Sequence, residues 1–213
     1  YTARILPQNL TWLFHTVIVP FPKMLVLLVR GIDEVKHLML PITAVLTFFG
    51  FSQVALADMA ISSSSFADGK IAKVHACSKM GGKNQSPPVS VSGLPSNATH
   101  IAIIMDDPDA KSVAGKTWVH WNVFNIKAEG DGYSIDAAKK PNGLIGKNSG
   151  GSGYGGMCPP NGKHTYRLAA FALKEEVKVK ASGWSGKAYT IEKFEKDFKG
   201  SILAKTMIIG DFK

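Results

Sequence analysis

Apolar residues in this chain fall mainly into short segments of the kind that form β-strands. Residues 100–105 (HIAIIM) are a nearly continuous apolar run bounded by polar residues, which predicts a strand buried on both faces. Residues 117–126 (TWVHWNVFNI) and 164–173 (HTYRLAAFAL) predict two further strands. Shorter strands are expected within five other segments, of which the fourth would form a sheet edge: 59–66, 71–77, 89–91, 175–180 and 207–212.

One segment near the C-terminus has helical periodicity. Ile191, Phe194, Phe198 and Ile202 recur at spacings of three and four, which predicts a helix over 190–205 with its first residue as the N-cap. The glycine- and lysine-containing stretches 81–88 and 127–149 are expected to be loops. These elements together predict a mainly β, antiparallel single domain with a late helix.

Apolar sequence also precedes the predicted domain. Lys36 and His37 lead into a 14-residue apolar run, and residues 55–57 read Ala-Leu-Ala. A basic start, a short apolar centre and an A-x-A ending are typical of a secretory signal peptide, here residues 35–57, and 14 residues are fewer than the ~20 of a membrane-spanning helix. We therefore expect cleavage after Ala57 and a periplasmic or secreted protein comprising residues 58–213.

Residues 1–34 allow two interpretations. The chain begins with Tyr1 rather than Met, so this stretch can be upstream sequence that is not part of the native protein. The alternative is a membrane segment at 10–29, which Pro20, Pro22 and Lys23 disfavour. We favour the first interpretation.

Composition narrows the classes of partner and cofactor. Lysine and arginine exceed the acidic residues by nine, but the basic residues are scattered. Without a basic stripe interleaved with aromatic residues nucleic acid is not expected, whereas anionic small molecules are. Cys77 and Cys158 are the only cysteines, and in an exported chain we favour a disulfide over two separate buried thiols. No Cys/His spacing suggests a metal, and no cofactor is expected.

Candidate site residues lie at the ends of the three main predicted strands. Asp106, Asp107 and Asp109 follow the first strand, where the alternative is an ordinary solvated turn. The second strand carries Trp118, His120 and Asn122 at alternate positions, predicting a shared face, although a histidine between aromatic residues is often only a core residue.

The third strand begins with His164 and Tyr166 on one face, after the glycine-rich stretch 150–163. Two imidazoles and a phenol can donate hydrogen bonds to an anion, an aspartate can orient an imidazole, and glycine amides can form an anion-binding nest. The combination predicts a pocket that binds phosphate or a similar anion without a metal.

Three motifs carry a resemblance to a known family: DDPDA (106–110), WVHW (118–121) and GYGGMCPPNGKHTYR (153–167), with support from NQSPPVSVSGLP (84–95). Over 58–213 the chain resembles the phosphatidylethanolamine-binding proteins, also called Raf kinase inhibitor-like proteins. The resemblance implies an antiparallel β-sandwich with flanking helices. It also implies an anion pocket made of Asp107, Asp109, Trp118, His120, Tyr154, Gly156, Pro159, Pro160, His164 and Tyr166.

The resemblance further implies a non-catalytic protein that binds phospholipid head groups or other small anions. Some family members inhibit kinases or proteases, so an inhibitor acting through loops such as 127–149 is an alternative, and a homodimer is suggested. The bacterial branch carries cysteines at positions resembling Cys77 and Cys158. A hydrolase is a weaker alternative, because no G-x-S-x-G motif occurs and Cys158 is the only candidate nucleophile beside the pocket.

Overall fold

A computed structural model describes residues 58–181 and 186–213 of the chain. The predicted upstream extension (1–34) and signal peptide (35–57) lie outside the described residues. Among the residues described, no helix is long and apolar enough to cross a membrane.

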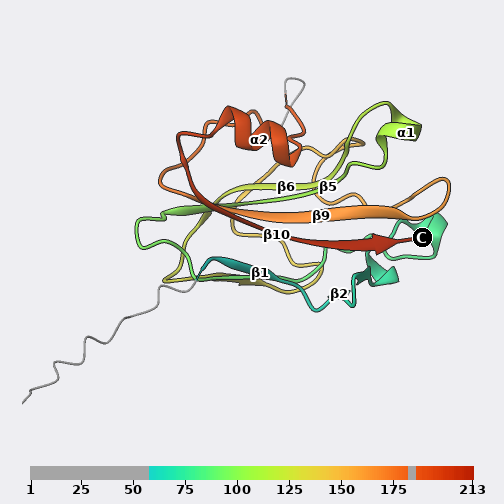
Figure 1. Ribbon diagram of the computed structural model, residues 1–213, viewed down its shortest axis with the longest axis horizontal. Coiled ribbons are helices and arrows are strands. Elements are labelled where there is room, and N and C mark those ends of the chain that lie inside the picture. Colours follow the sequence, from blue (N-terminus) through green and yellow to red (C-terminus); the bar gives the residue numbers. More distant parts are fainter. Residues whose placement is uncertain (1–57, 182–185) are drawn as a thin grey trace, which may run out of the picture. The chain divides into compact units, whose positions relative to one another are not determined.

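Two β-sheets form the domain (Figure 1). The larger has seven strands, and all of its neighbouring strands are antiparallel except β3 and β10. Its order is β2 (Phe66–Ala67), β3 (Lys70–Ile71), β10 (Ile202–Phe212), β9 (His164–Leu173), β5 (His100–Asp107), β6 (Trp118–Lys127) and β8 (Leu144–Ile145). The smaller sheet contains β1 (Ala60–Ser62), β4 (Val89–Ser92) and β7 (Tyr133–Ile135). The mainly β antiparallel sandwich is confirmed.

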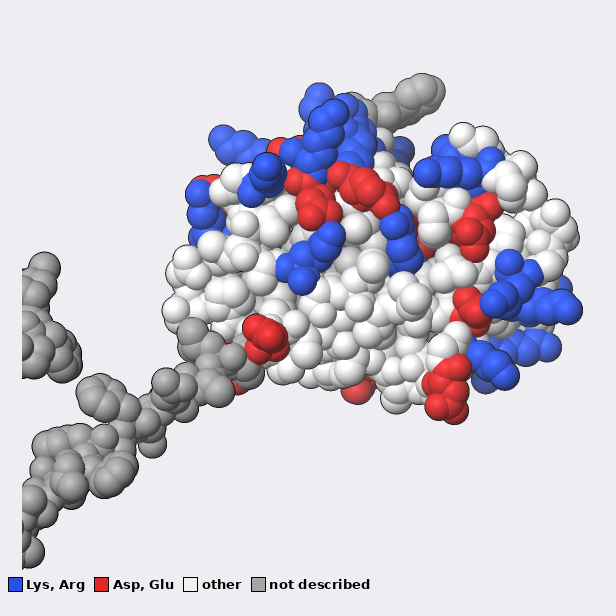
Figure 2. All heavy atoms as spheres, in the orientation of Figure 1, with Lys and Arg blue, Asp and Glu red and all other residues white. Residues whose placement is uncertain are grey.

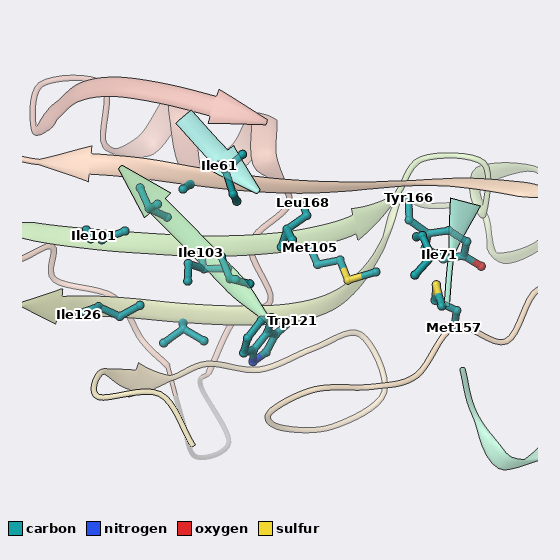
Figure 3. Packing of buried hydrophobic residues seen from close by; sticks show 14 of the residues in the cluster. Ile61, Ile71, Ile101, Ile103, Met105, Trp121, Ile126, Met157, Tyr166 and Leu168 are labelled. Atoms are coloured by element: carbon teal, nitrogen blue, oxygen red, sulfur yellow. The ribbon is translucent and has the colours of Figure 1, made fainter. Parts of the chain in front are cut away.

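The main core lies between the two sheets. Ile61 of β1 belongs to one apolar cluster with Ile103 and Met105 of β5 and Leu168 of β9, and Figure 3 shows these side chains converging between the strands. The opposite face of the large sheet packs against α2 (Ile191–Asp197), whose Phe194 is fully buried. Because both faces are covered, the run Ile101–Met105 of β5 is apolar and fully buried, as the pattern at 100–105 predicted.

The C-terminal helix is shorter than predicted. The side chain of Thr190 caps its first turn by accepting from the Lys193 amide (3.2 Å), as expected, but α2 ends at Asp197 rather than at 205. The amide of Ser201 closes a turn on the Phe198 carbonyl (2.9 Å), and β10 begins at the next residue. The long ladder between β10 and β9 replaces the helical hydrogen bonds, so the last strand starts well before 207.

Three other expectations about local structure were wrong, and one short helix was missed. Only the start of 71–77 is strand, because the short 3₁₀ helices η1 (Lys73–His75) and η2 (Ser78–Met80) follow β3. The segment 175–180 forms no strand, since the Val177 backbone bonds to the side chain of Asn125. The expected loop 127–149 contains β7 and β8. The short helix α1 (Lys111–Ala114) was not predicted, because one turn gives no periodic signal.

A β-bulge changes the facing of residues on β6. Met105 pairs with Trp121 and Asp106 with Val119, so His120 has no opposite residue on β5. His120 consequently faces the inter-sheet side, whereas Asn122 points to the α2 side and hydrogen-bonds Tyr189. The prediction that His120 and Asn122 share a face was wrong, because an extra residue in the strand shifts the alternation.

Candidate functional site

A cavity of about 540 Å³ opens at the ends of three inner strands of the large sheet, where β5 ends and β6 and β9 begin. Antiparallel pairing brings these three strand ends together, although the residues are far apart in sequence. The helix α1 and the glycine-rich segment complete the wall. The cavity is lined by Asp107, Ala110, Val113, Ala114, Trp118, His120, Asn148, Gly150, Gly151, Ser152, Gly155, Gly156, Cys158, Pro159, Pro160 and His164.

His164 and Asp107 form a buried pair within this cavity. The distance from His164 Nδ1 to Asp107 Oδ2 is 2.7 Å, and only 5% and 4% of the two side chains remain exposed. The other carboxylate oxygen of Asp107 accepts hydrogen bonds from the amides of Asp109 (2.9 Å) and Ala110 (3.1 Å). Because a carboxylate accepts, His164 donates from Nδ1, and its Nε2 has no hydrogen-bond partner among the residues described.

His120 is oriented in the same way by a different acceptor. Its Nδ1 lies 2.6 Å from the carbonyl oxygen of Gly155, which can only accept, so Nδ1 carries the hydrogen. Burial lowers the pKa of His120, against the opposing effects of the Gly155 bond and of the Asp107 charge. The ring is therefore neutral at neutral pH, with a lone pair on Nε2.

Tyr166 lies against both imidazoles. Its ring centroid is 5.2 Å from that of His120 and 6.4 Å from that of His164. Its hydroxyl is buried and finds no hydrogen-bond partner in the described part of the chain, and burial raises its pKa. Tyr166 therefore supports the two rings as a neutral phenol whose hydrogen-bonding capacity is unused.

The structure brings most of the ten predicted pocket residues to the cavity wall. Seven of them line it: Asp107, Trp118, His120, Gly156, Pro159, Pro160 and His164. Tyr166 lies behind the histidines rather than on the wall.

The other two predicted residues, Asp109 and Tyr154, do not line the cavity and bond to neighbouring backbone instead. The carboxylate of Asp109 accepts from the Thr165 amide (2.8 Å), which fixes the start of β9, and the Tyr154 hydroxyl donates to the His75 carbonyl (2.7 Å). Sequence reasoning missed the polar lining residues Asn148 and Ser152. Their only signal was a place in or next to the glycine-rich segment.

A disulfide links the pocket wall at Cys158 to Cys77, which lies 81 positions earlier in the sequence, and the two Cα atoms are 5.5 Å apart. Alongside it, the Gly156 amide donates to the side-chain oxygen of Asn84 (2.6 Å). A Cβ on Gly156 would lie 2.6 Å from that same oxygen, so only glycine allows this approach. Gly156 thus positions the wall through backbone contacts.

The polar groups at the cavity are arranged for hydrogen bonding rather than for metal binding. Across residues 58–181 and 186–213, no group of three or more His, Cys, Asp or Glu side chains is arranged to hold a metal ion. What faces the cavity instead is two imidazoles, the Asn148 and Ser152 side chains, and an apolar wall that includes Trp118 and the proline pair.

The fold and motifs match known proteins. A family model described as phosphatidylethanolamine-binding protein matches residues 62–213. A UPF0098 protein of Methanothermobacter thermautotrophicus is 35% identical over 161 residues, covering 73% of this chain and 99% of the relative. A Mycobacterium tuberculosis relative named as a lipoprotein, LppC, is 40% identical over 118 residues, covering 54% of this chain and 55% of its own length.

Two solved structures of similar proteins have the same fold. The crystal structure of Escherichia coli YbcL, described as a member of the mammalian PEBP family, superposes with a TM-score of 0.62 at 26% identity, covering 74% of this chain and 99% of YbcL. A homolog from Chlamydia trachomatis, CT736, gives a TM-score of 0.60 at 28% identity over 73% of this chain and 97% of its own.

Proposed function

The chain belongs to the phosphatidylethanolamine-binding protein family, and we propose that it binds a small anionic group, such as a phosphorylated head group, without catalysing a reaction. The observation that carries this proposal is the arrangement of His120 and His164. Each commits Nδ1 to a fixed acceptor, Gly155 O or Asp107 Oδ2. Among the residues that the structure describes, neither Nε2 has a hydrogen-bond partner, and both rings line the same cavity.

This arrangement couples anion binding to proton uptake. A neutral imidazole whose Nδ1 holds the hydrogen offers only a lone pair at Nε2, which repels an anion. When the ring gains a proton, Nε2 becomes a charged donor, and hydrogen bonds between charged partners are about twice as strong as neutral ones. The anion should therefore bind more tightly as pH falls.

The size and lining of the cavity fit more than a bare ion. A volume of about 540 Å³ is within the range of small-molecule sites. Ala110, Val113, Trp118 and the prolines at 159 and 160 provide apolar surface next to the polar groups. We expect a ligand whose anionic group contacts the imidazoles and whose apolar portion packs on this wall.

Calorimetric titration of the full chain with phosphoethanolamine tests the proposal. We expect saturable binding that weakens by about 10-fold or more in His120→Ala and in His164→Ala, because a hydrogen bond to a charged group contributes about 1.5–3 kcal/mol. His100→Ala is the matched control, since His100 begins β5 at the opposite end from Asp107. Unchanged affinity in both pocket variants would exclude this pocket as the site.

Cys158 was the one candidate nucleophile for a hydrolase, and its sulfur is bonded to Cys77. A disulfide offers no thiolate for attack, which supports a binding role over a cysteine-dependent enzyme. Native mass spectrometry of the purified chain would report a retained ligand and would also test the predicted homodimer.

We also propose that the protein is exported. The disulfide supports this, because such bonds persist in oxidising compartments, and one relative is named as a lipoprotein. Mass analysis of protein recovered outside the cytoplasm should give a chain beginning at Asp58. Recovery only in the cytoplasm with the leading residues intact would contradict export.

A further inference from the structure

A second concave surface, with many lysines, lies on the α2 side of the large sheet. We call it the basic groove, and its volume of about 840 Å³ exceeds that of the pocket. Five lysines from α1, two loops and α2 border it: Lys111, Lys116, Lys147, Lys193 and Lys196. Figure 2 shows basic side chains gathered over α2 and again around α1, at the upper edge of the view.

The acidic residues of the groove are already engaged by basic partners. The carboxylate of Glu192 binds the Arg167 guanidinium at 2.5 Å, and Asp197 binds Lys193 at 2.7 Å. The other four groove lysines have no carboxylate within ion-pair distance among the residues that the structure describes. The groove therefore carries an excess of positive charge that its own acidic groups do not balance.

The floor of the groove offers neutral hydrogen-bonding groups. It is made of small or neutral residues: Thr117, Val119, Asn148, Ser149, Gly186, Ala188 and Thr190. Such a surface can hydrogen-bond a peptide backbone while the bordering lysines contact acidic side chains. The cations in the lining are all lysines. Lysine carries a compact charge on a flexible side chain, which suits acidic groups at variable positions. Arginine, by contrast, suits a carboxylate held in one fixed plane.

We propose that the basic groove docks an acidic peptide segment of a partner protein. Charge complementarity favours that partner, since opposed potentials steer encounter and select partners. The concave shape favours an extended chain over a flat membrane. The size and the spread of the lysines over α1, the loops and α2 favour a chain with several charges over a single small ion.

This surface is separate from the anion pocket. Trp118 and His120 line the pocket, whereas Thr117 and Val119 line the groove. Asn148 borders both. Because the lysines of the groove do not line the pocket, peptide docking and anion binding can be tested by different variants, and the failure of one leaves the other standing.

Fluorescence anisotropy of a labelled polyglutamate peptide of about eight residues, titrated with the full chain, tests the proposal. We expect saturable binding that is absent for polyglutamine of equal length and that weakens with added salt, since exposed charges are screened. The variant Lys147→Glu/Lys196→Glu should bind at least about fivefold more weakly. Lys79→Glu/Lys139→Glu changes the net charge equally at exposed sites outside the groove and should bind within about twofold of wild type.

Three results would overturn the proposal. The first is no saturable binding of polyglutamate by wild type. The second is an equal loss in both double variants, which would mean attraction by net charge alone. The third is binding to phosphatidylglycerol vesicles with the same dependence on Lys147 and Lys196 but none to the peptide, which would assign the surface to a membrane. Thermal unfolding and phosphoethanolamine titration of each variant verify that the fold and the pocket persist.

Discussion

His164 Nδ1 lies 2.7 Å from Asp107 Oδ2, and both side chains are almost completely buried at the edge of the pocket. The two residues come from different strands, β9 and β5, and are 57 positions apart in sequence. Since the amides of Asp109 and Ala110 hold the other oxygen of Asp107, the carboxylate cannot rotate freely. This pair therefore fixes which nitrogen of His164 faces the ligand.

The variant Asp107→Asn should reverse the tautomer of His164. The asparagine oxygen would continue to accept from the two backbone amides, so its NH₂ group would face Nδ1 and donate to it. The hydrogen of a neutral His164 would then sit on Nε2, ready to donate to an anion without proton uptake. We expect phosphoethanolamine affinity to depend less steeply on pH than in wild type.

A profile as steep as that of wild type would show that Asp107 does not control the His164 tautomer. Asp136→Asn, at an exposed aspartate outside the pocket, is the control and should leave the profile unchanged.

Acid should destabilise the fold through two buried histidines. Burial lowers the pKa of His75 below its ordinary 6.5, and it also lowers the pKa of His120. The folded state therefore prefers both rings neutral, while the unfolded chain takes up protons below about pH 6.5. We expect the urea midpoint to fall as pH drops from about 7.5 to about 5.5.

The variant His75→Gln/His120→Gln should show a smaller fall than wild type, whatever its midpoint at the higher pH. An equal fall in variant and wild type would mean that other groups cause the acid sensitivity.

Removing the disulfide should cost about 2–4 kcal/mol of unfolding free energy, because the bond closes a long loop in the unfolded chain. The double variant Cys77→Ala/Cys158→Ala leaves no reactive thiol and is measured by urea unfolding. Wild type in reducing agent should approach the stability of this variant. A change of less than about 0.5 kcal/mol would show that the backbone contacts around Gly156 hold the wall unaided.

Asn122 ties the segment before α2 to the large sheet. Its side chain donates to the Tyr189 carbonyl (3.0 Å) and accepts from the Tyr189 amide (2.7 Å), and Asn122 is fully buried. The variant Asn122→Ala leaves both backbone groups without these partners and should destabilise by about 2–4 kcal/mol in urea unfolding. The exposed Asn161→Ala serves as control and should stay within about 0.5 kcal/mol of wild type.

The long strands could be predicted from the sequence because each contains a continuous or regularly spaced series of apolar residues. Strand β9 spans His164–Leu173, as its polar start and apolar continuation predicted. The end of α2 could not be read in the same way. Phe198 and Ile202 keep the helical spacing, yet pairing of β10 with β9 extends the strand to Ile202, and only the tertiary structure decides between the two.

The sequence predicted which residues meet at the pocket, but not which of them line its wall and which pack behind it. Chemistry-bearing residues at three strand ends predicted that Asp107, His120 and His164 meet. The bulge that separates the facing of His120 from that of Asn122 depends on pairing with β5, which no local pattern records. In the same way, nothing in the motif distinguishes Tyr166, packed behind the imidazoles, from a wall residue.

The most direct test of the account is an NMR measurement of the imidazole nitrogens during titration with phosphoethanolamine at about pH 7.5. Without ligand, His120 and His164 should both carry their hydrogen on Nδ1, and the ligand should shift the Nε2 signals of both toward the protonated form. His75 is the internal control, because its two ring nitrogens already contact Gln85 O and Ser65 Oγ, and its signals should stay in place. If the His120 and His164 signals do not move, or move no more than those of His75, the anion does not bind between the two imidazoles.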